Sequence, residues 1–133
     1  MTGATTRNLK ETTMADISGF DHIALAVPNL DEQIERLTTL MGMVVQSRSE
    51  RYALVADPRS GFKIELSLSA DAETHFRHMG FRTSDVDAGH QALVDSGFIS
   101  TEGPHRRDFA KMYTAFLKDE SGLEVQLVKY DQE

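Results

Sequence analysis

At 133 residues, with 40% hydrophobic and 26% charged residues, the chain has the size and composition of one globular domain with its own core. It contains no cysteine, which excludes disulfides and thiolate chemistry and agrees with a cytoplasmic location. The formal net charge is −7, no basic cluster stands out, and no apolar run approaches the ~18 residues of a membrane span, so we expect neither nucleic acid nor membrane as a partner.

The first half of the chain predicts a strand, a helix and three further strands. Apolar residues at helical spacing indicate the helix, which begins after Pro28-Asn29 and ends before Gly42. Period-two alternation and β-branched residues indicate the strands, which we expect over 21–27, 43–47, 52–56 and 62–68. Residues 1–16 are polar and lack the apolar core of an export signal, and we expect them to form a flexible tail.

The second half predicts the same order of elements. After a small, polar linker over 69–75, we expect a helix over about 86–96 that ends before Gly97. The expected strands cover 77–83, 98–101, 112–117 and 123–129. Residues 102–108 carry Gly103, Pro104 and several charges, and we expect a loop there.

The two halves therefore repeat one plan. His22 and His78 each open a strand run, and they lie 56 positions apart. The same offset pairs Leu30 with Val86, Asp31 with Asp87, and Leu37 with Leu93. The prediction is an α+β fold, in which two βαβββ repeats form a curved mixed sheet. One domain would span 17–133, with its halves at about 20–68 and 76–130.

Strand periodicity places several polar side chains on common faces. His22 and His78 are each followed, two residues on, by a small residue on the same face. Lys63 and Glu65 share one face of their strand, and Glu124 and Gln126 share one face of theirs. Nitrogen and oxygen ligands of this kind suit a divalent metal such as zinc, nickel, iron(II), manganese or cobalt.

At this point the chain resembles a known family, the vicinal oxygen chelate superfamily, which includes glyoxalase I, bleomycin-resistance proteins and extradiol dioxygenases. The resemblance covers about residues 20–130 and rests on the segments DHIALAVPNLDEQIERL, SGFKIELS, HMGFRTSDVDAGHQAL and KDESGLEVQLV. It implies a glyoxalase-like fold around a metal and ligand cavity. It also implies metal ligands at His22, Glu65, His78 and a position near the end of the last strand.

The fourth ligand is open between two residues. Glu65 follows the turn glycine Gly61 by four positions, and the matching residue after Gly122 is Gln126 rather than a glutamate. In one arrangement the amide oxygen of Gln126 binds the metal and leaves Glu124 free as a catalytic base. In the other, a register shift brings Glu124 to the metal. We favour the first, with Glu124 and Glu65 as the candidate catalytic carboxylates.

Three further residues are candidates for substrate binding: Arg82 and Lys63, as anion-binding groups in the cavity, and Tyr113. Each also has a purely structural interpretation, since either cation would serve equally well as a partner of Glu124 and a strand tyrosine is commonly a core residue. His105, Arg106 and Arg107 belong to the charged segment that we expect to be a solvated loop.

The favoured function is a small metal-dependent enzyme of lyase, isomerase or epimerase type. It would transfer a proton on a small oxygenated metabolite whose neighbouring oxygens bind the metal. One alternative is an iron(II) dioxygenase of the same fold, and another is a metal-free protein that sequesters its ligand, as in bleomycin resistance. We also expect a homodimer, and the short linker favours sites in which His22 and Glu65 come from one chain and His78 and Gln126 from the other.

Overall fold

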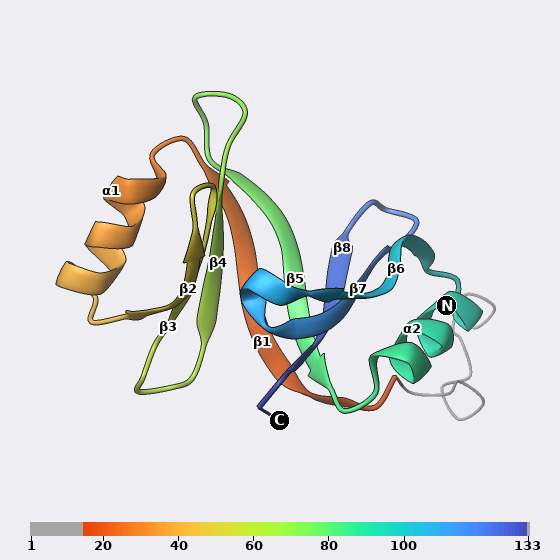
Figure 1. The fold of residues 1–133 in the computed structure, drawn as a ribbon. Helices are drawn as coiled ribbons and strands as arrows, with labels where there is room; N and C mark the ends of the chain where they lie inside the picture. Colours follow the sequence, from red (N-terminus) through yellow and green to blue (C-terminus); the bar gives the residue numbers. More distant parts are fainter. Residues whose placement is uncertain (1–14, 133) are drawn as a thin grey trace, which may run out of the picture.

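The computed structural model describes residues 15–132, so the predicted tail lies, except for its last two residues, outside the described part of the chain. Two βαβββ units follow one another (Figure 1). The first comprises β1 (Ile17–Val27), α1 (Leu30–Glu35), a π-helical turn η2 (Arg36–Leu40), β2 (Val44–Ser49), β3 (Tyr52–Ala56) and β4 (Lys63–Leu68). The second comprises β5 (His75–Thr83), α2 (Val86–Asp95), β6 (Ile99–Arg107), a 3₁₀ turn η3 (Asp108–Ala110), β7 (Met112–Lys118) and β8 (Glu124–Tyr130).

The eight strands form one curved sheet in the order β2-β3-β4-β1-β5-β8-β7-β6 (Figure 1). The first strand of each unit lies at the centre, where β1 and β5 pair antiparallel. Each central strand also pairs in parallel with the last strand of its own unit, β1 with β4 and β5 with β8. The fold class and the repeat predicted from the sequence are confirmed. No helix within residues 15–132 is both long and apolar enough to cross a membrane.

The pairing of β1 with β5 joins the two halves side by side within one chain. The exchange of halves between two chains stays a prediction. Because β4 is parallel to β1 and β5 is antiparallel to it, β4 ends and β5 begins at the same end of β1. The connection therefore crosses a single strand, a span of about 10 Å at ~4.8 Å per strand spacing. The six residues between Leu68 and His75 reach that distance easily.

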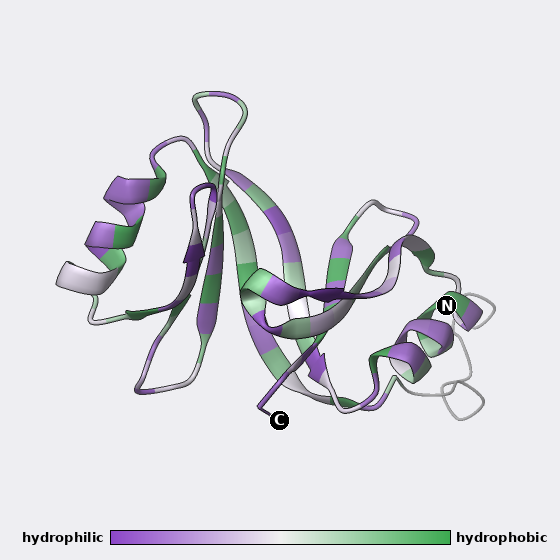
Figure 2. Cartoon of the chain, viewed as in Figure 1, coloured by the Kyte–Doolittle hydropathy of each residue, from purple (hydrophilic) through white to green (hydrophobic). Residues whose placement is uncertain are grey.

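Three clusters of buried side chains hold the sheet and its helices together. One lies under α1 and includes Ile34, Val55 and Leu66, and one lies under α2 and includes Val86, Leu117 and Leu127. The third joins the two units across the concave face: Tyr52, Leu54, Ala110, Met112, Val128 and Tyr130. The hydrophobic and hydrophilic bands that alternate along the central strands in Figure 2 reflect this division between the helix-covered face and the concave face.

The segment 102–108, expected to be a loop, is instead mostly strand. β6 runs through Gly103-Pro104 to Arg107 and pairs with β7, with register irregularities between Ser100 and His105. β6 is the edge of the sheet, where proline is tolerated because one side of the strand has no ladder to complete. The charged side chains along this edge also discourage pairing with another sheet.

Candidate metal centre and adjoining cavity

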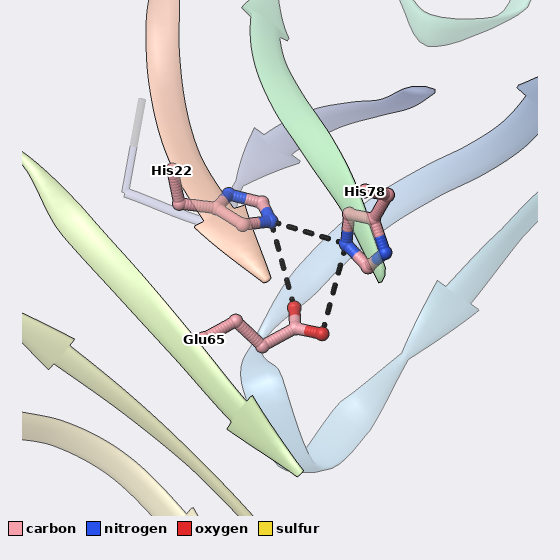
Figure 3. Close-up of side chains that lie close together, drawn as sticks. All are labelled: His22, Glu65 and His78. Atoms are coloured by element: carbon pink, nitrogen blue, oxygen red, sulfur yellow. Dashed lines mark hydrogen bonds and ion pairs between the residues drawn. The ribbon is translucent and has the colours of Figure 1, made fainter. Parts of the chain in front are cut away.

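Four polar side chains from the four central strands meet on the concave face: His22, Glu65, His78 and Gln126. The Nε2 atoms of His22 and His78 lie 3.4 Å apart, and Gln126 Oε1 lies 2.9 Å from each of them. The Glu65 carboxylate lies 3.5 Å from His22 Nε2 and 3.7 Å from His78 Nε2 (Figure 3). All four residues are buried. The sequence analysis singled out these four residues, and the fold brings them together within one chain.

The register of the central strands explains why they meet. On the β1–β5 pair, His22 lies opposite Gly80 and His78 lies opposite Ala24, so each imidazole faces a small residue on the neighbouring strand. The His22 ring lies over Gly80 so closely that a Cβ added there would be 2.0 Å from Cε1 of the ring. Glycine at position 80 is thus a requirement of the close approach.

A buried carboxylate sets the orientation of His22. Asp21 Oδ2 lies 2.8 Å from His22 Nδ1, and it also accepts a hydrogen bond of 2.5 Å from the Tyr130 hydroxyl. The Lys63 ammonium and the Arg82 guanidinium lie 3.2 and 3.4 Å from Oδ1. Burial raises the pKa of Asp21, but the hydrogen bonds from His22 and Tyr130 and the charge of Lys63 outweigh it and hold the pKa below its usual value.

Asp21 is therefore an ionised acceptor, and the proton that it shares with His22 belongs to Nδ1. With a proton on Nδ1, the Nε2 atom of His22 faces His78, Glu65 and Gln126. A carboxylate behind the distal nitrogen of an imidazole is a common support for a metal-binding histidine, because it fixes the tautomer and the ring plane.

A second buried contact orients the amide of Gln126. The Thr114 hydroxyl donates to the carbonyl oxygen of Leu127 at 2.6 Å, which leaves its oxygen free to accept from Gln126 Nε2 at 2.8 Å. The amide NH₂ is thereby turned toward Thr114, and the amide oxygen faces the two imidazoles. This is the orientation in which glutamine offers an oxygen ligand.

The electrostatics of the cluster suit a cation. Burial raises the pKa of Glu65, against the lowering effect of His22, Arg107 and Arg77. Burial, followed by the nearness of His22, lowers the pKa of His78 to about 3, so this imidazole is neutral at pH 7. Two imidazole nitrogens, an amide oxygen and a carboxylate converge here. Most of the atoms that face one another are hydrogen-bond acceptors. A divalent ion would satisfy all of them at once, so the residues present fit such a metal.

A cavity of about 190 Å³ opens beside this cluster. Its lining includes Glu65 and His78 from the cluster and Glu124 from the start of β8. The remaining lining residues are Tyr52, Ser67, Arg77, Glu102, Arg107 and Phe116. Glu124 accepts a hydrogen bond of 3.1 Å from the Thr101 hydroxyl and is only partly buried.

The three residues expected to bind substrate lie elsewhere. Lys63 and Arg82 face Asp21 rather than the cavity or Glu124, and Lys63 also lies over the ring of Tyr130, 4.1 Å from its centroid. The Tyr113 hydroxyl donates to Asp87 of α2, on the opposite side of the sheet from the cluster. The two cations thus have their near partner in the carboxylate that supports His22, and Tyr113 faces α2, so the structure does not bring these three side chains into the cavity.

Several residues around the site were not recognised in the sequence, among them Asp21, Tyr52, Arg77 and Arg107. Arg77 occupies the position in β5 that Asp21 occupies in β1, since the offset is again 56. No described residue within 15–132 makes a hydrogen bond of normal length to the Tyr52 hydroxyl, which is buried beside Glu65. The repeat itself carried the signal for Asp21 and Arg77, because both directly precede a histidine.

A curved mixed sheet of two βαβββ units, with two histidines, a glutamate and a glutamine at its centre, defines a class of small-molecule and metal-binding proteins. The chain belongs to the Glyoxalase/Bleomycin resistance protein/Dioxygenase superfamily, whose family model matches residues 19–127. Members of this superfamily generally bind a divalent metal, and the His/Glu/His group needed for one is present here.

Individual relatives include enzymes of several types. The chain is 29% identical over 124 residues to "Probable lactoylglutathione lyase" of Vibrio cholerae serotype O1, covering 84% of this chain and 90% of that one. Methylmalonyl-CoA epimerase from Mycobacterium tuberculosis superposes with a TM-score of 0.74 at 26% identity, over 89% of this chain and 91% of that one. The 2,3-dioxygenase LapB from Pseudomonas sp. KL28 shares the fold alone, with a TM-score of 0.72 at 15% identity over 90% of this chain and 46% of that one.

Proposed function

We propose that the protein is a metal-dependent enzyme that moves a proton on a small oxygenated metabolite, as a lyase, isomerase or epimerase. The observation that carries the proposal is the convergence of four buried ligand atoms beside a cavity that contains a further carboxylate. The similarity to a lyase and to an epimerase supports the same class of reaction. Homodimerisation and a cytoplasmic location stay predictions.

In this proposal His22, Glu65, His78 and Gln126 hold one divalent ion, which is zinc, nickel, iron(II), manganese or cobalt. The ion supplies positive charge that stabilises negative charge on two neighbouring oxygens of the substrate. Asp21 and Thr114 act through His22 and Gln126 by keeping their ligand atoms turned inward. The neutral state of His78 at pH 7 leaves a nitrogen lone pair available for binding without the loss of a proton.

Glu124 is the proposed acid and base. It lines the same cavity as Glu65 and His78 but lies outside the group of converging ligand atoms, so it is not needed to hold the ion. Its partial exposure and its single neutral donor, the Thr101 hydroxyl, leave a carboxylate oxygen available to take a proton next to the substrate carbonyl. Glu65, buried and adjacent to both imidazoles, is assigned to the metal instead.

The experiment that tests this compares four variants: Glu124→Gln, Gln126→Ala, His22→Ala and, as a control on an exposed turn, Glu120→Gln. Metal content is measured by elemental analysis. Proton abstraction is measured as deuterium incorporation from D₂O by NMR, with the glutathione adduct of methylglyoxal and methylmalonyl-CoA as first probes.

We expect about one metal per chain in the wild type, the control and Glu124→Gln, and loss of metal in His22→Ala. Deuterium incorporation should disappear in both Glu124→Gln and His22→Ala. Absence of bound metal in the wild type after loading would favour a ligand-sequestering protein, and oxygen consumption in place of deuterium exchange would favour a dioxygenase. Loss of metal in Glu124→Gln but not in Gln126→Ala would exchange the roles of these two residues.

A further inference from the structure

The cavity contains two arginines that the proposed proton transfer does not use. Arg107, at the end of β6, places its guanidinium over the ring of Phe116, 4.8 Å from the centroid. The Phe116 ring in turn packs edge-to-face against His78, with centroids 5.1 Å apart. Because Phe116 is common to both contacts, the guanidinium carbon lies no farther than about 10 Å from the centre of the His78 ring.

Arg77 also lines the cavity and lies in β5, directly before His78. No carboxylate of the described residues 15–132 forms an ion pair with it, although its charge acts on both Glu65 and His78. Arg107 has a loose partner, since its Nη2 lies 3.4 Å from an oxygen of Glu102, whose side chain is half exposed. Ion pairs this exposed contribute little, so a ligand can displace Glu102 at small cost.

The charges of the lining residues match one anionic group. The charged residues around the cavity are three glutamates, 65, 102 and 124, and two arginines, 77 and 107, because imidazoles that bind a metal are neutral. These five side chains together have a net charge of −1. A divalent ion on the four proposed ligands changes the net charge of the cavity to +1. A substrate with a single carboxylate then leaves the cavity neutral.

The size of the cavity limits the ligand further. At about 190 Å³ it is smaller than the ~300–1,000 Å³ of sites that enclose drug-sized molecules. The reacting part of the substrate is therefore a short-chain acid, and any larger carrier group would have to lie outside. A planar guanidinium packed on an aromatic ring is well suited to a carboxylate, which it binds through two parallel hydrogen bonds.

We propose that the substrate is a small acid with a pair of neighbouring oxygens at one end and a carboxylate at the other. The pair of oxygens faces the cluster of His22, Glu65, His78 and Gln126. Arg107 binds the carboxylate, and Arg77 is a second cation at the rim of the cavity. This inference rests on the proposed function, because it takes the metal end of the cavity as the place where the substrate reacts.

Hydroxamic acids allow the two ends of the cavity to be tested separately, because they bind metals through two neighbouring oxygens. Butyrohydroxamate and succinomonohydroxamate have chains of the same length, and they end in a methyl group and in a carboxylate. Their affinities for the metal-loaded protein are measured by isothermal titration calorimetry. The variants are Arg107→Gln, Arg77→Gln, Glu102→Gln and, as a control, Arg106→Gln, whose side chain pairs with Asp108 and Asp131 away from the cavity.

The wild type should bind the succinyl probe roughly tenfold or more tightly than the butyryl probe. Arg107→Gln should remove most of this preference, Arg77→Gln a smaller part of it and Arg106→Gln none, while butyrohydroxamate affinity stays unchanged throughout. Glu102→Gln should strengthen binding of the succinyl probe by a few-fold, because it removes the competitor of the ligand carboxylate. A variant that merely failed to fold would lose affinity for the succinyl probe, so it would not show this increase.

Equal affinity of the two probes in the wild type, or an equal loss for both in Arg107→Gln, would overturn the carboxylate site and leave the proposed function intact. If neither probe binds to protein shown to contain metal, the proposed function fails and this inference fails with it. A phosphonate-terminated hydroxamate that binds more tightly than the succinyl probe would overturn the choice of a carboxylate.

Discussion

The two halves of the molecule follow one plan but support their histidines differently. In both, the first strand pairs with the last strand in the same register, with Ala24 opposite Glu65 in one half and Gly80 opposite Gln126 in the other. The residue before the histidine distinguishes them. In the first half it is Asp21, 1% exposed and bonded to His22, whereas in the second half it is Arg77, exposed at the cavity.

This difference divides the work of the site between the halves. The first half contributes a rigidly held imidazole, because Asp21 fixes His22 from behind and Lys63, Arg82 and Tyr130 hold Asp21. The second half contributes most of the cavity: His78, Arg77, Glu124, Phe116 and, from β6, Glu102 and Arg107. A duplicated fold can therefore keep a metal-binding arrangement symmetrical while only one half changes the surroundings of the substrate.

The largest effect should come from the glycine that lets the two halves approach. In Gly80→Ala the new methyl group would lie 2.0 Å from a fully buried ring that Asp21 holds in place, so His22 must move away from the cluster. We expect zinc affinity to fall by more than about 100-fold and the free energy of unfolding by about 1–3 kcal/mol. Calorimetric titration with zinc and urea unfolding measure the two effects.

Gly103→Ala is the matched control, because no atom lies within 4 Å of a Cβ added at that position and its backbone is not left-handed. Its zinc affinity should equal that of the wild type. A Gly80→Ala protein with unchanged zinc affinity would mean that His22 does not need its present position to bind metal.

The comparison of halves also explains what the sequence did and did not predict. Repeat offset and strand alternation placed histidines, carboxylates and an amide on shared strand faces, and the family resemblance then singled out His22, Glu65 and His78, with Gln126 preferred over Glu124. The position of Asp21 before a repeated histidine is visible in the sequence, but its contact with His22 is not, because a bulge intervenes: Phe20 lies opposite Phe81 and His22 opposite Gly80, so Asp21 is an extra residue with no partner in the register. Alternation places it on the face opposite to His22, whereas the bulge lets both side chains meet.

The same limit applies to Arg107 and to the two cations, Lys63 and Arg82, that were expected in the cavity. β6 contains two register irregularities, so no periodic rule states which of its charged side chains face inward. Lys63 and Arg82 do lie near the site, but the choice between the cavity and a buried carboxylate depends on Asp21, whose contacts the sequence did not reveal. Local pattern and the family resemblance thus predicted the proposed ligands, and the irregularities of the backbone determined their surroundings.

A smaller effect than that of Gly80→Ala is expected for Asp21→Asn. An amide at this position can turn its NH₂ toward Nδ1 of His22, which moves the proton of the imidazole to Nε2 and blocks the ligand atom. We expect zinc affinity to fall by about 10–100-fold. In the metal-free protein, ¹⁵N chemical shifts of the imidazole should show Nδ1 protonated in the wild type and Nε2 protonated in the variant.

Asp95→Asn removes the same charge from an exposed position at the end of α2 and should leave both the tautomer and the affinity unchanged. If Asp21→Asn retains the wild-type tautomer and yet loses zinc, the carboxylate acts through its charge rather than by orienting the ring.

The smallest effect is expected for Tyr130→Phe, because Tyr130 contacts Asp21 rather than a proposed metal ligand. The Tyr130 hydroxyl is buried and donates its hydrogen bond of 2.5 Å to the same oxygen of Asp21 that faces His22. Its removal leaves Asp21 with Lys63, Arg82 and His22, so the carboxylate stays ionised and the tautomer of His22 is preserved. We expect a loss of about 1.5–3 kcal/mol in the free energy of unfolding, the usual value for a hydrogen bond to a charged group, and only a few-fold decrease in zinc affinity.

Tyr113→Phe is the control. The Tyr113 hydroxyl also donates to a carboxylate, that of Asp87, but this contact lies at the surface, and we expect its loss to change the free energy of unfolding by less than about 0.5 kcal/mol. Urea unfolding of the metal-free proteins and zinc titration distinguish the two tyrosines. Equal losses of stability would show that the buried network beneath His22 is no stronger than a surface contact, and the asymmetry between the halves would then reside in Asp21 alone.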